Sequence, residues 1–377
     1  MKLLHLSDLH IGKRLNEFSL IEDQRFILNQ ICDIVKENAP DAVLIAGDVY
    51  DKSVPSAEAV SLFDEFLVNL SRLNTRIMVI SGNHDSPERI AFGSRLMEAS
   101  GVYMCPVYSA ESRSVTLADE YGECDIYMLP FVKPANVRRF FPDEEIESYT
   151  DAIRLAVNNM NIDTEKRNVL IAHQYVTGAE RSESEELSVG GLDNVDVSVF
   201  LDFDYVALGH IHGPQNCADN VRYCGTPLKY SFSEVEHKKS ATLVTLGKKG
   251  DISLDTIPLS PMREMYRLYG SFDELLGKGR DDDALREAFV QITLTDEDEV
   301  PDALAILRAF YHNIMELRYD NTRTRNIGKE VGAVDVKNRS PLELVGEFYS
   351  YRNGREMSEE ESTIVRSLIE EIWEDGE

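Results

Sequence analysis

Short apolar runs alternate with helical patterns along the first half of the chain, and no other feature constrains the fold as strongly. Residues 3–6, 42–46 and 76–80 are apolar runs of strand length, whereas residues 56–73 repeat apolar side chains at the spacing of an amphipathic helix. Strands that alternate with helices are typical of β–α units, so the sequence predicts an α/β fold.

Another helix is predicted between the first two of these strands. Ser19 and Glu22 have the spacing of a capping box, which marks the start of a helix. The apolar residues that continue the helical pattern are Phe26, Ile27, Ile31, Ile34 and Val35.

The middle of the chain carries more strand signals. Apolar runs at 125–129, 169–172 and 205–208 predict three strands. Two further runs, 241–246 and 252–257, flank a turn that contains two glycines, which predicts a β-hairpin.

The pattern changes near residues 258–261, where we expect a domain boundary. Beyond it the sequence predicts a small α+β unit with one strand at 289–294, an acidic turn and a helix at 301–317. The polar stretch 321–339 predicts a linker.

Two helices are predicted for the remaining residues, 340–377. Ser340 and Glu343 form one capping box, and Ser358 and Glu361 form a second. The expected segments are therefore 1–260, 261–320, 321–339 and 340–377.

Composition places the chain among folded proteins. It has 377 residues, of which 43% are hydrophobic and 28% are charged. No stretch reaches the roughly 18 apolar residues of a membrane span, and Asp8 interrupts the segment where an export signal would continue. Five cysteines without a C-x-x-C pair predict reduced thiols, so we expect a cytoplasmic protein with no membrane association.

The net charge of −28 argues weakly against a protein that holds nucleic acid by itself, because such proteins usually carry a basic surface. Much of the acid lies in local runs, such as residues 281–283 and 359–361, and metal-ligating carboxylates would be offset by their cations. A partner subunit could supply the main grip on DNA.

Five polar motifs directly follow predicted strands. They are Asp8-x-His10, Asp48, Asn83-His84, His173 and His210-x-His212. The carboxyl ends of strands in an open α/β sheet meet at one crevice, so residues far apart in sequence can share a site there.

These residue types suit a pair of divalent transition metals. Imidazole and carboxylate together favour manganese, iron or zinc over magnesium or calcium. Side chains two apart on an extended backbone point the same way, which would aim both residues of Asp8-x-His10 at one ion. Asp48 could bridge two cations about 3.5–4 Å apart, an arrangement that clamps a phosphate for in-line attack.

Each motif alone is ordinary turn chemistry, and a lone histidine more often satisfies a protein core than binds a metal. The set is stronger than its members, because five of the eight histidines fall in it, each at the end of a predicted strand.

The ordered set resembles the calcineurin-like metallophosphoesterase superfamily over about two thirds of the chain. That resemblance implies a two-sheet sandwich flanked by helices. It also implies one metal held by Asp8, His10, Asp48 and His212, and a second held by Asp48, Asn83, His173 and His210. His84 would protonate the leaving oxygen or stabilise the transition state, and the carboxylate of Asp51 would orient His84.

Other residues narrow the resemblance. Lys52, Ser53 and Asp85 differ from the protein-phosphatase branch. The similarity is instead to the SbcD family of bacterial nuclease subunits, at residues 5–12, 182–185, 189–191, 222–227 and 340–344.

This second resemblance implies a manganese-dependent exonuclease on double-stranded DNA and endonuclease on hairpins and single strands, acting in DNA repair, recombination and replication. It also implies a heterotetramer with an SbcC-type ATPase, and a homodimer through the nuclease domain. Residues 261–320 would form a capping domain over DNA, and residues 340–377 would dock on the ATPase. Ordinary surface helices are the alternative for this tail.

Two other functions stay open. One is a small-molecule phosphodiesterase or pyrophosphatase on the same fold, which would need neither a second domain nor a docking tail. The other is a catalytically inactive DNA-binding scaffold, which the complete ligand set and the intact His84 disfavour.

Overall fold

The computed structural model describes residues 1–111, 113–182, 185, 193–322, 324, 325, 342, 345, 346, 348–350, 355–358 and 361–365. The chain divides into two compact units, residues 1–293 with 302–318 and residues 294–301 with 319–377, and each is described by itself.

The first unit is built on a six-stranded sheet. Its order is β16–β15–β1–β4–β5–β6, in which β1, β4, β5 and β6 are parallel and the β15–β16 hairpin pairs antiparallel to β1. The strands are β1 (Lys2–Leu6), β4 (Ala42–Ala46), β5 (Arg76–Ile80), β6 (Val102–Cys105), β15 (Ser240–Leu246) and β16 (Ile252–Pro258).

A second six-stranded sheet has the order β13–β14–β12–β9–β8–β7, with β8, β9, β12 and β14 parallel. Its strands are β7 (Arg113–Asp119), β8 (Gly122–Leu129), β9 (Arg167–His173), β12 (Tyr205–Gly209), β13 (Gln215–Ala218) and β14 (Val221–Tyr223). Short ladders join β2 (Arg14–Leu15) to β3 (Phe18–Ser19), and β10 (Tyr175–Val176) to β11 (Asn194–Val195).

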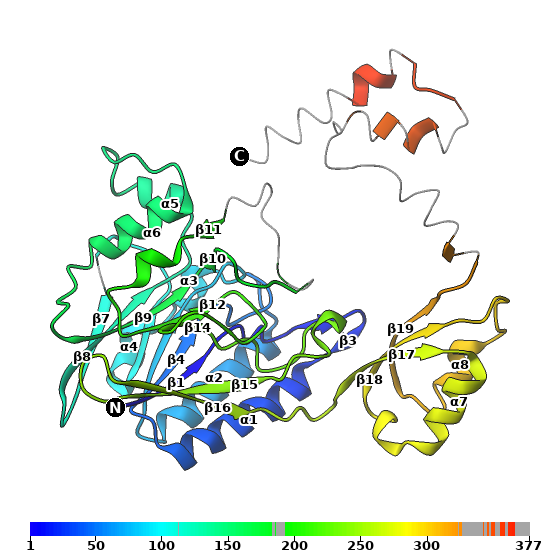
Figure 1. Cartoon of the computed structure of the whole chain (residues 1–377), viewed down its shortest axis with the longest axis horizontal. Coiled ribbons are helices and arrows are strands. Elements are labelled where there is room, and N and C mark those ends of the chain that lie inside the picture. The colour runs from blue at the N-terminus through cyan, green and yellow to red at the C-terminus, as the bar shows by residue number, and fades with distance from the viewer. Residues whose placement is uncertain are drawn as a thin grey trace. The chain divides into compact units, whose positions relative to one another are not determined.

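Alternation along the strands creates the layers, because successive side chains of a strand point to opposite faces. Leu4 and Leu6 of β1 belong to a core shared with α1 (Ile21–Asn38) and α2 (Ala57–Ser71). Leu3 instead belongs to a core that also contains residues of the second sheet. The sheets therefore pack face to face, as Figure 1 shows.

The outer face of the second sheet is covered by α5 (Pro134–Arg138) and α6 (Tyr149–Asn158). Short helices α3 (Pro87–Ile90) and α4 (Ser94–Met97) follow β5. The predicted α/β sandwich with flanking helices is confirmed. No helix among the described residues has both the length and the apolar character needed to cross a membrane.

A three-stranded sheet follows β16, in the order β17–β18–β19. Its elements are β17 (Met265–Gly270), α7 (Phe272–Asp281), β18 (Phe289–Leu294), α8 (Ala303–Leu307) and β19 (Asn313–Tyr319). Ser271 and Glu274 close a capping box at the start of α7.

The predicted helix at 301–317 is wrong, because only Ala303–Leu307 is helical and Asn313–Tyr319 is a strand. Ala303, Leu307 and Tyr311 are buried at four-residue steps, a spacing that imitates a longer helix. The side chain of Tyr311 is held by its hydroxyl, which donates to Leu275 O at 2.6 Å.

Two details of the first helix also differ from expectation. Leu20, not Ser19, occupies its N-cap and makes no side-chain cap, so the predicted capping box is absent there. Phe26 is 42% exposed, and Leu28 is buried beside Ile27 and Ile31 instead.

In the second unit the predicted capping box at Ser358 is confirmed. Glu361 N donates to Ser358 Oγ at 3.2 Å, Ser358 N donates to the Glu361 carboxylate at 2.8 Å, and residues 361–365 are helical. The capping box predicted at Ser340 and most of the predicted linker lie outside the described residues.

Candidate metal centre

The predicted site residues lie where five strands end. β1, β4 and β5 of the first sheet end at Leu6, Ala46 and Ile80, and β9 and β12 of the second end at His173 and Gly209. Both sheets therefore contribute ligand loops, and the structure brings all of these loops together.

One cluster contains Asp8, His10 and His212. All three are buried, and one donor atom of each lies within 4.8 Å of the others. His10 Nε2 and His212 Nε2 face each other at 3.2 Å. Two imidazole nitrogens and a carboxylate converging in this way can hold one divalent ion.

A second cluster surrounds the amide oxygen of Asn83. Asn83 Oδ1 lies 2.9 Å from His210 Nδ1 and 3.0 Å from His173 Nε2. His173 Nδ1 is committed to a 2.8 Å hydrogen bond with Ala46 O, so Nε2 is the nitrogen available to a ligand.

Asp48 joins the two clusters. Its Oδ2 lies 3.7 Å from His10 Nε2 and 3.3 Å from His173 Nε2, while its Oδ1 accepts from His84 N at 2.9 Å. One oxygen therefore faces both clusters, and the other fixes the carboxylate in place.

Left-handed backbone, and not an extended strand, aims several of these side chains. The φ angles are 52° at Asp8, 43° at His10, 47° at Asp48 and 108° at His210. The expectation of an extended Asp8-x-His10 segment is therefore wrong. Such conformations cost about 1–3 kcal/mol each and are found mainly at functional sites.

Two glycines allow the loops to approach closely. A Cβ on Gly82 would lie 2.1 Å from Asp48 Oδ1, and a Cβ on Gly209 would lie 1.8 Å from Ala46 O. No side chain fits at either position, so the two sheets meet backbone to backbone beside the site.

Asp85 holds two of the loops together, a role that the sequence did not reveal. Its carboxylate accepts from the main-chain nitrogens of Val49 (3.1 Å), Tyr50 (3.0 Å) and Gly82 (2.9 Å). Burial, together with the charge of Asp48, raises the pKa of Asp85 to about 7. The carboxylate thus tethers the loop after β4 to the loop after β5.

Charge is unevenly shared among the buried ligands. Burial raises the pKa of Asp8 to about 6. Burial opposes ionisation of Asp48 as well, but the neighbouring His173 outweighs it and holds the pKa of Asp48 well below its usual range. Burial lowers the pKa of His210 to about 3, which keeps this imidazole neutral as a ligand must be.

His84 sits beside the clusters but is only half-buried. Its Nδ1 donates to the main-chain carbonyl of Asp51 at 3.2 Å. The carboxylate of Asp51 lies 2.7 Å from Lys13 Nζ instead. The side chain of Asp51 therefore does not orient His84 as the resemblance implied, and the main chain makes that contact.

Two further acids contact His212. Glu234 Oε1 lies 3.0 Å from His212 Nδ1, and Glu185 Oε1 accepts from His212 N at 2.7 Å. Neither has a sequence signal, since each stands among other polar residues and follows no predicted strand.

The donor set fits two divalent ions. The clusters are buried, combine imidazole with carboxylate and amide oxygen, and share the one carboxylate oxygen that faces both.

Comparisons with known proteins agree with this geometry. Residues 1–214 match the family described as calcineurin-like phosphoesterase, and residues 261–353 match the type 5 capsule protein repressor C-terminal domain, also called SbcD_C. The chain is 31% identical to the D-type subunit of the nuclease SbcCD from Staphylococcus epidermidis over 377 residues, which is 98% of each protein.

Two solved structures show weaker likeness. A dimetal phosphatase from Danio rerio is 11% identical with a TM-score of 0.36, over 69% of this chain and 99% of that one. The protein TT1561 of Thermus thermophilus is 12% identical with a TM-score of 0.40, over 68% and 98%. At these scores neither likeness carries weight, and the assignment rests on the sequence matches. On those matches the chain belongs to the calcineurin-like phosphoesterases and, within them, to the family of SbcD-type subunits.

Proposed function

We propose that this protein is a two-metal DNA nuclease, an exonuclease on double strands and an endonuclease on single strands and hairpins. The observation that carries the proposal is the Asp48 oxygen shared by two buried clusters, in a chain that belongs to the SbcD family. Such a pair of sites is suited to phosphodiester hydrolysis.

Asp8, His10, Asp48 and His212 would hold one ion, and Asp48, Asn83, His173 and His210 the other. Bound divalent cations supply Lewis-acid activation of water and neutralise charge on the phosphate. Manganese is the proposed metal, because mixed imidazole and oxygen ligands favour it over magnesium and calcium.

His84 is the proposed proton donor to the leaving oxygen. The carbonyl of Asp51 accepts from its Nδ1, so Nε2 is the nitrogen left to face the substrate. Its partial exposure beside buried ligands is what a group needs if it must reach a phosphodiester without binding a metal.

The proposed partners follow from the family. We propose DNA as the substrate in repair, recombination and replication, and an SbcC-type ATPase as the partner in a heterotetramer. Residues 261–320 would cap the DNA, residues 321–339 would be a linker and residues 340–377 would dock on the ATPase. We expect the protein in the cytoplasm, because a DNA substrate and an ATP-consuming partner are found there.

A homodimer through the nuclease domain is also proposed. Phe92 and Leu96, beside the short helices α3 and α4, are 84% and 82% exposed, and a large exposed aromatic and a leucine so close together favour an interface. Replacing both by glutamate should shift sedimentation from dimer to monomer, whereas Leu201→Glu, 62% exposed elsewhere, should not.

One experiment tests the activity. A plasmid with an extruded hairpin and a chromogenic nucleotide diester are each incubated with the protein and manganese, alongside the Asp48→Asn variant. Cleavage of the hairpin by the wild-type chain alone supports the proposal. Hydrolysis of the diester without DNA cleavage would favour a small-molecule phosphodiesterase, and DNA binding without cleavage an inactive scaffold.

A further inference from the structure

The second nitrogen of His212 has a charged partner away from the metal side. His212 Nε2 faces His10 Nε2 at 3.2 Å, while His212 Nδ1 lies 3.0 Å from Glu234 Oε1. Glu234 ends the short 3-10 helix Phe232–Glu234 and has no exposed surface. A carboxylate without solvent contact is costly unless its oxygens are satisfied, so this arrangement needs a reason.

The other oxygen of Glu234 is held by donors. Lys239 Nζ donates to Glu234 Oε2 at 2.5 Å, and Tyr230 N does so at 3.3 Å. Lys239 also donates to His212 O at 3.0 Å and to Thr226 Oγ1 at 2.6 Å, which accounts for all three of its protons. Lys239 therefore fixes the carboxylate and the main chain of His212 together.

Hydrogen-bond chemistry then dictates where the proton of His212 sits. An ionised carboxylate can only accept, so Nδ1 must carry the proton and Nε2 must present its lone pair. We propose that Glu234, anchored by Lys239, is a positioning residue that sets the tautomer of His212 for metal binding. The inference rests on the proposed function only in taking His212 as a metal ligand.

The other cluster uses the same logic with a main-chain group. His173 Nδ1 lies 2.8 Å from Ala46 O, an acceptor that likewise forces the lone pair onto Nε2. Each proposed metal thus has one histidine whose tautomer is set by an acceptor, and only the Glu234 contact can be removed by substitution.

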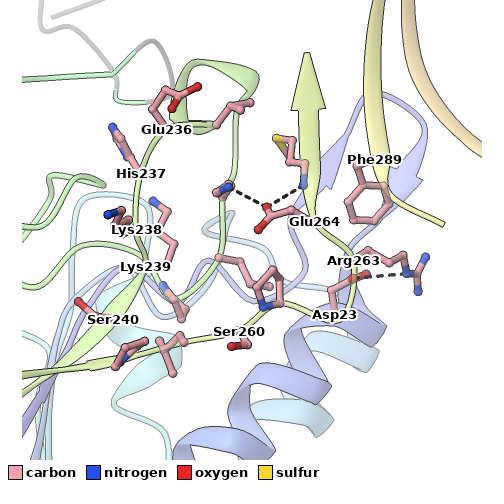
Figure 2. Close-up of a pocket in the computed structure, with 18 of the residues that line it drawn as sticks. Asp23, Glu236, His237, Lys238, Lys239, Ser240, Ser260, Arg263, Glu264 and Phe289 are labelled. Carbon is pink, nitrogen blue, oxygen red and sulfur yellow. Dashed lines mark hydrogen bonds and ion pairs between the residues drawn. The ribbon is translucent and has the colours of Figure 1, made fainter. Parts of the chain in front are cut away.

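Lys239 also separates this contact from an open space. It lines a cavity of about 580 Å³ together with His237, Lys238 and Arg263 (Figure 2). The side chain of Lys239 is itself buried, so it blocks water in the cavity from reaching Glu234.

The variant Glu234→Gln distinguishes tautomer control from simple packing. Lys239 Nζ and Tyr230 N are donors, so they require the new amide oxygen on their side. The amide nitrogen then faces His212 Nδ1 and can only donate, which moves the imidazole proton to Nε2. The conservative variant should therefore bind metal no better than Glu234→Ala, which imposes no tautomer, whereas a packing role predicts the opposite order.

The tautomer can be read directly in the metal-free protein. With ¹⁵N-histidine labelling, eight histidines give a spectrum in which His212 is assigned by its substitution. We expect a proton on Nδ1 of His212 in the wild type and on Nε2 in Glu234→Gln. Manganese titration should show about a 10–100-fold weaker site in that variant, the usual effect of removing such a partner.

Glu264→Gln is the matched control, because Glu264 lines the same cavity and pairs with Lys229 at 2.7 Å without touching a ligand. It should change neither measurement. An unchanged tautomer in folded Glu234→Gln, or manganese affinity equal to wild type, would overturn the proposal. Because neither readout needs DNA cleavage, a failed nuclease assay would leave this result intact.

Discussion

Asp48 is the residue at which the two clusters cannot be separated. Its Oδ2 faces a histidine of each, so Asp48→Ala should reduce the metal content of the purified protein from two ions per chain toward none. Asn83→Ala removes a donor from one cluster only and should lose about one ion. Elemental analysis after dialysis measures both, and two ions retained by Asp48→Ala would contradict the bridging role.

His84 should separate chemistry from metal binding. His84→Ser is expected to keep the wild-type metal content and to lower turnover by roughly 10²–10⁴-fold, the usual contribution of a positioned acid–base group. Loss of metal in this variant would mean that His84 is a ligand.

Asp51→Asn supplies the comparison. The orienting contact comes from the carbonyl of Asp51, which the substitution leaves unchanged, and only the ion pair with Lys13 is lost. We expect turnover within about tenfold of wild type, less than one acid–base group is worth. A loss as large as that of His84→Ser would return the orienting role to the side chain.

At this scale the sequence identified residue types better than geometry. Strand ends and residue chemistry were enough to select Asp48 and His173. Asp85, Glu234 and the left-handed backbone at Asp8 and His10 were not predictable, because they depend on contacts between loops of different strands.

Among the elements, two glycines in different settings predict opposite outcomes. Gly209→Ala would place a methyl group against Ala46 O, a main-chain atom that cannot yield, so we expect destabilisation of at least about 3 kcal/mol, the upper range for overpacking. Gly277→Ala lies within α7 with open space around it and should stabilise the protein by about 0.5–1 kcal/mol. Chemical denaturation measures both, and equal effects would contradict this difference.

Elements with one clear period were predictable, and those with two were not. β4 and β5 are continuous apolar runs, and both were predicted with their bounds. The segment after Pro301 fits a helical spacing at Ala303, Leu307 and Tyr311, yet the chain turns and pairs as β19, because the three-stranded sheet offers its backbone partners there.

For the whole molecule, the tail can be tested by truncation. A chain that ends at Arg339 should stay folded and keep manganese-dependent cleavage of single strands, because the proposed ligands all precede residue 213. It should no longer co-purify with an SbcC-type ATPase, and ATP should no longer stimulate cutting of duplex ends. Undiminished binding in a pull-down would mean that these residues belong to the protein's own core.

The division of the ligands between two sheets has a thermodynamic consequence. Asp8, Asp48 and Asn83 follow strands of one sheet, whereas His173, His210 and His212 lie at the ends of strands of the other. Each proposed cation therefore cross-links the two halves of the sandwich, and binding must be linked to folding. At a free metal concentration of 100 times Kd, each site would add about 2.7 kcal/mol to the free energy of unfolding. Chelation should accordingly lower the melting temperature and speed amide hydrogen exchange at the strand ends, so that metal supply acts on the lifetime of the protein as well as on its chemistry.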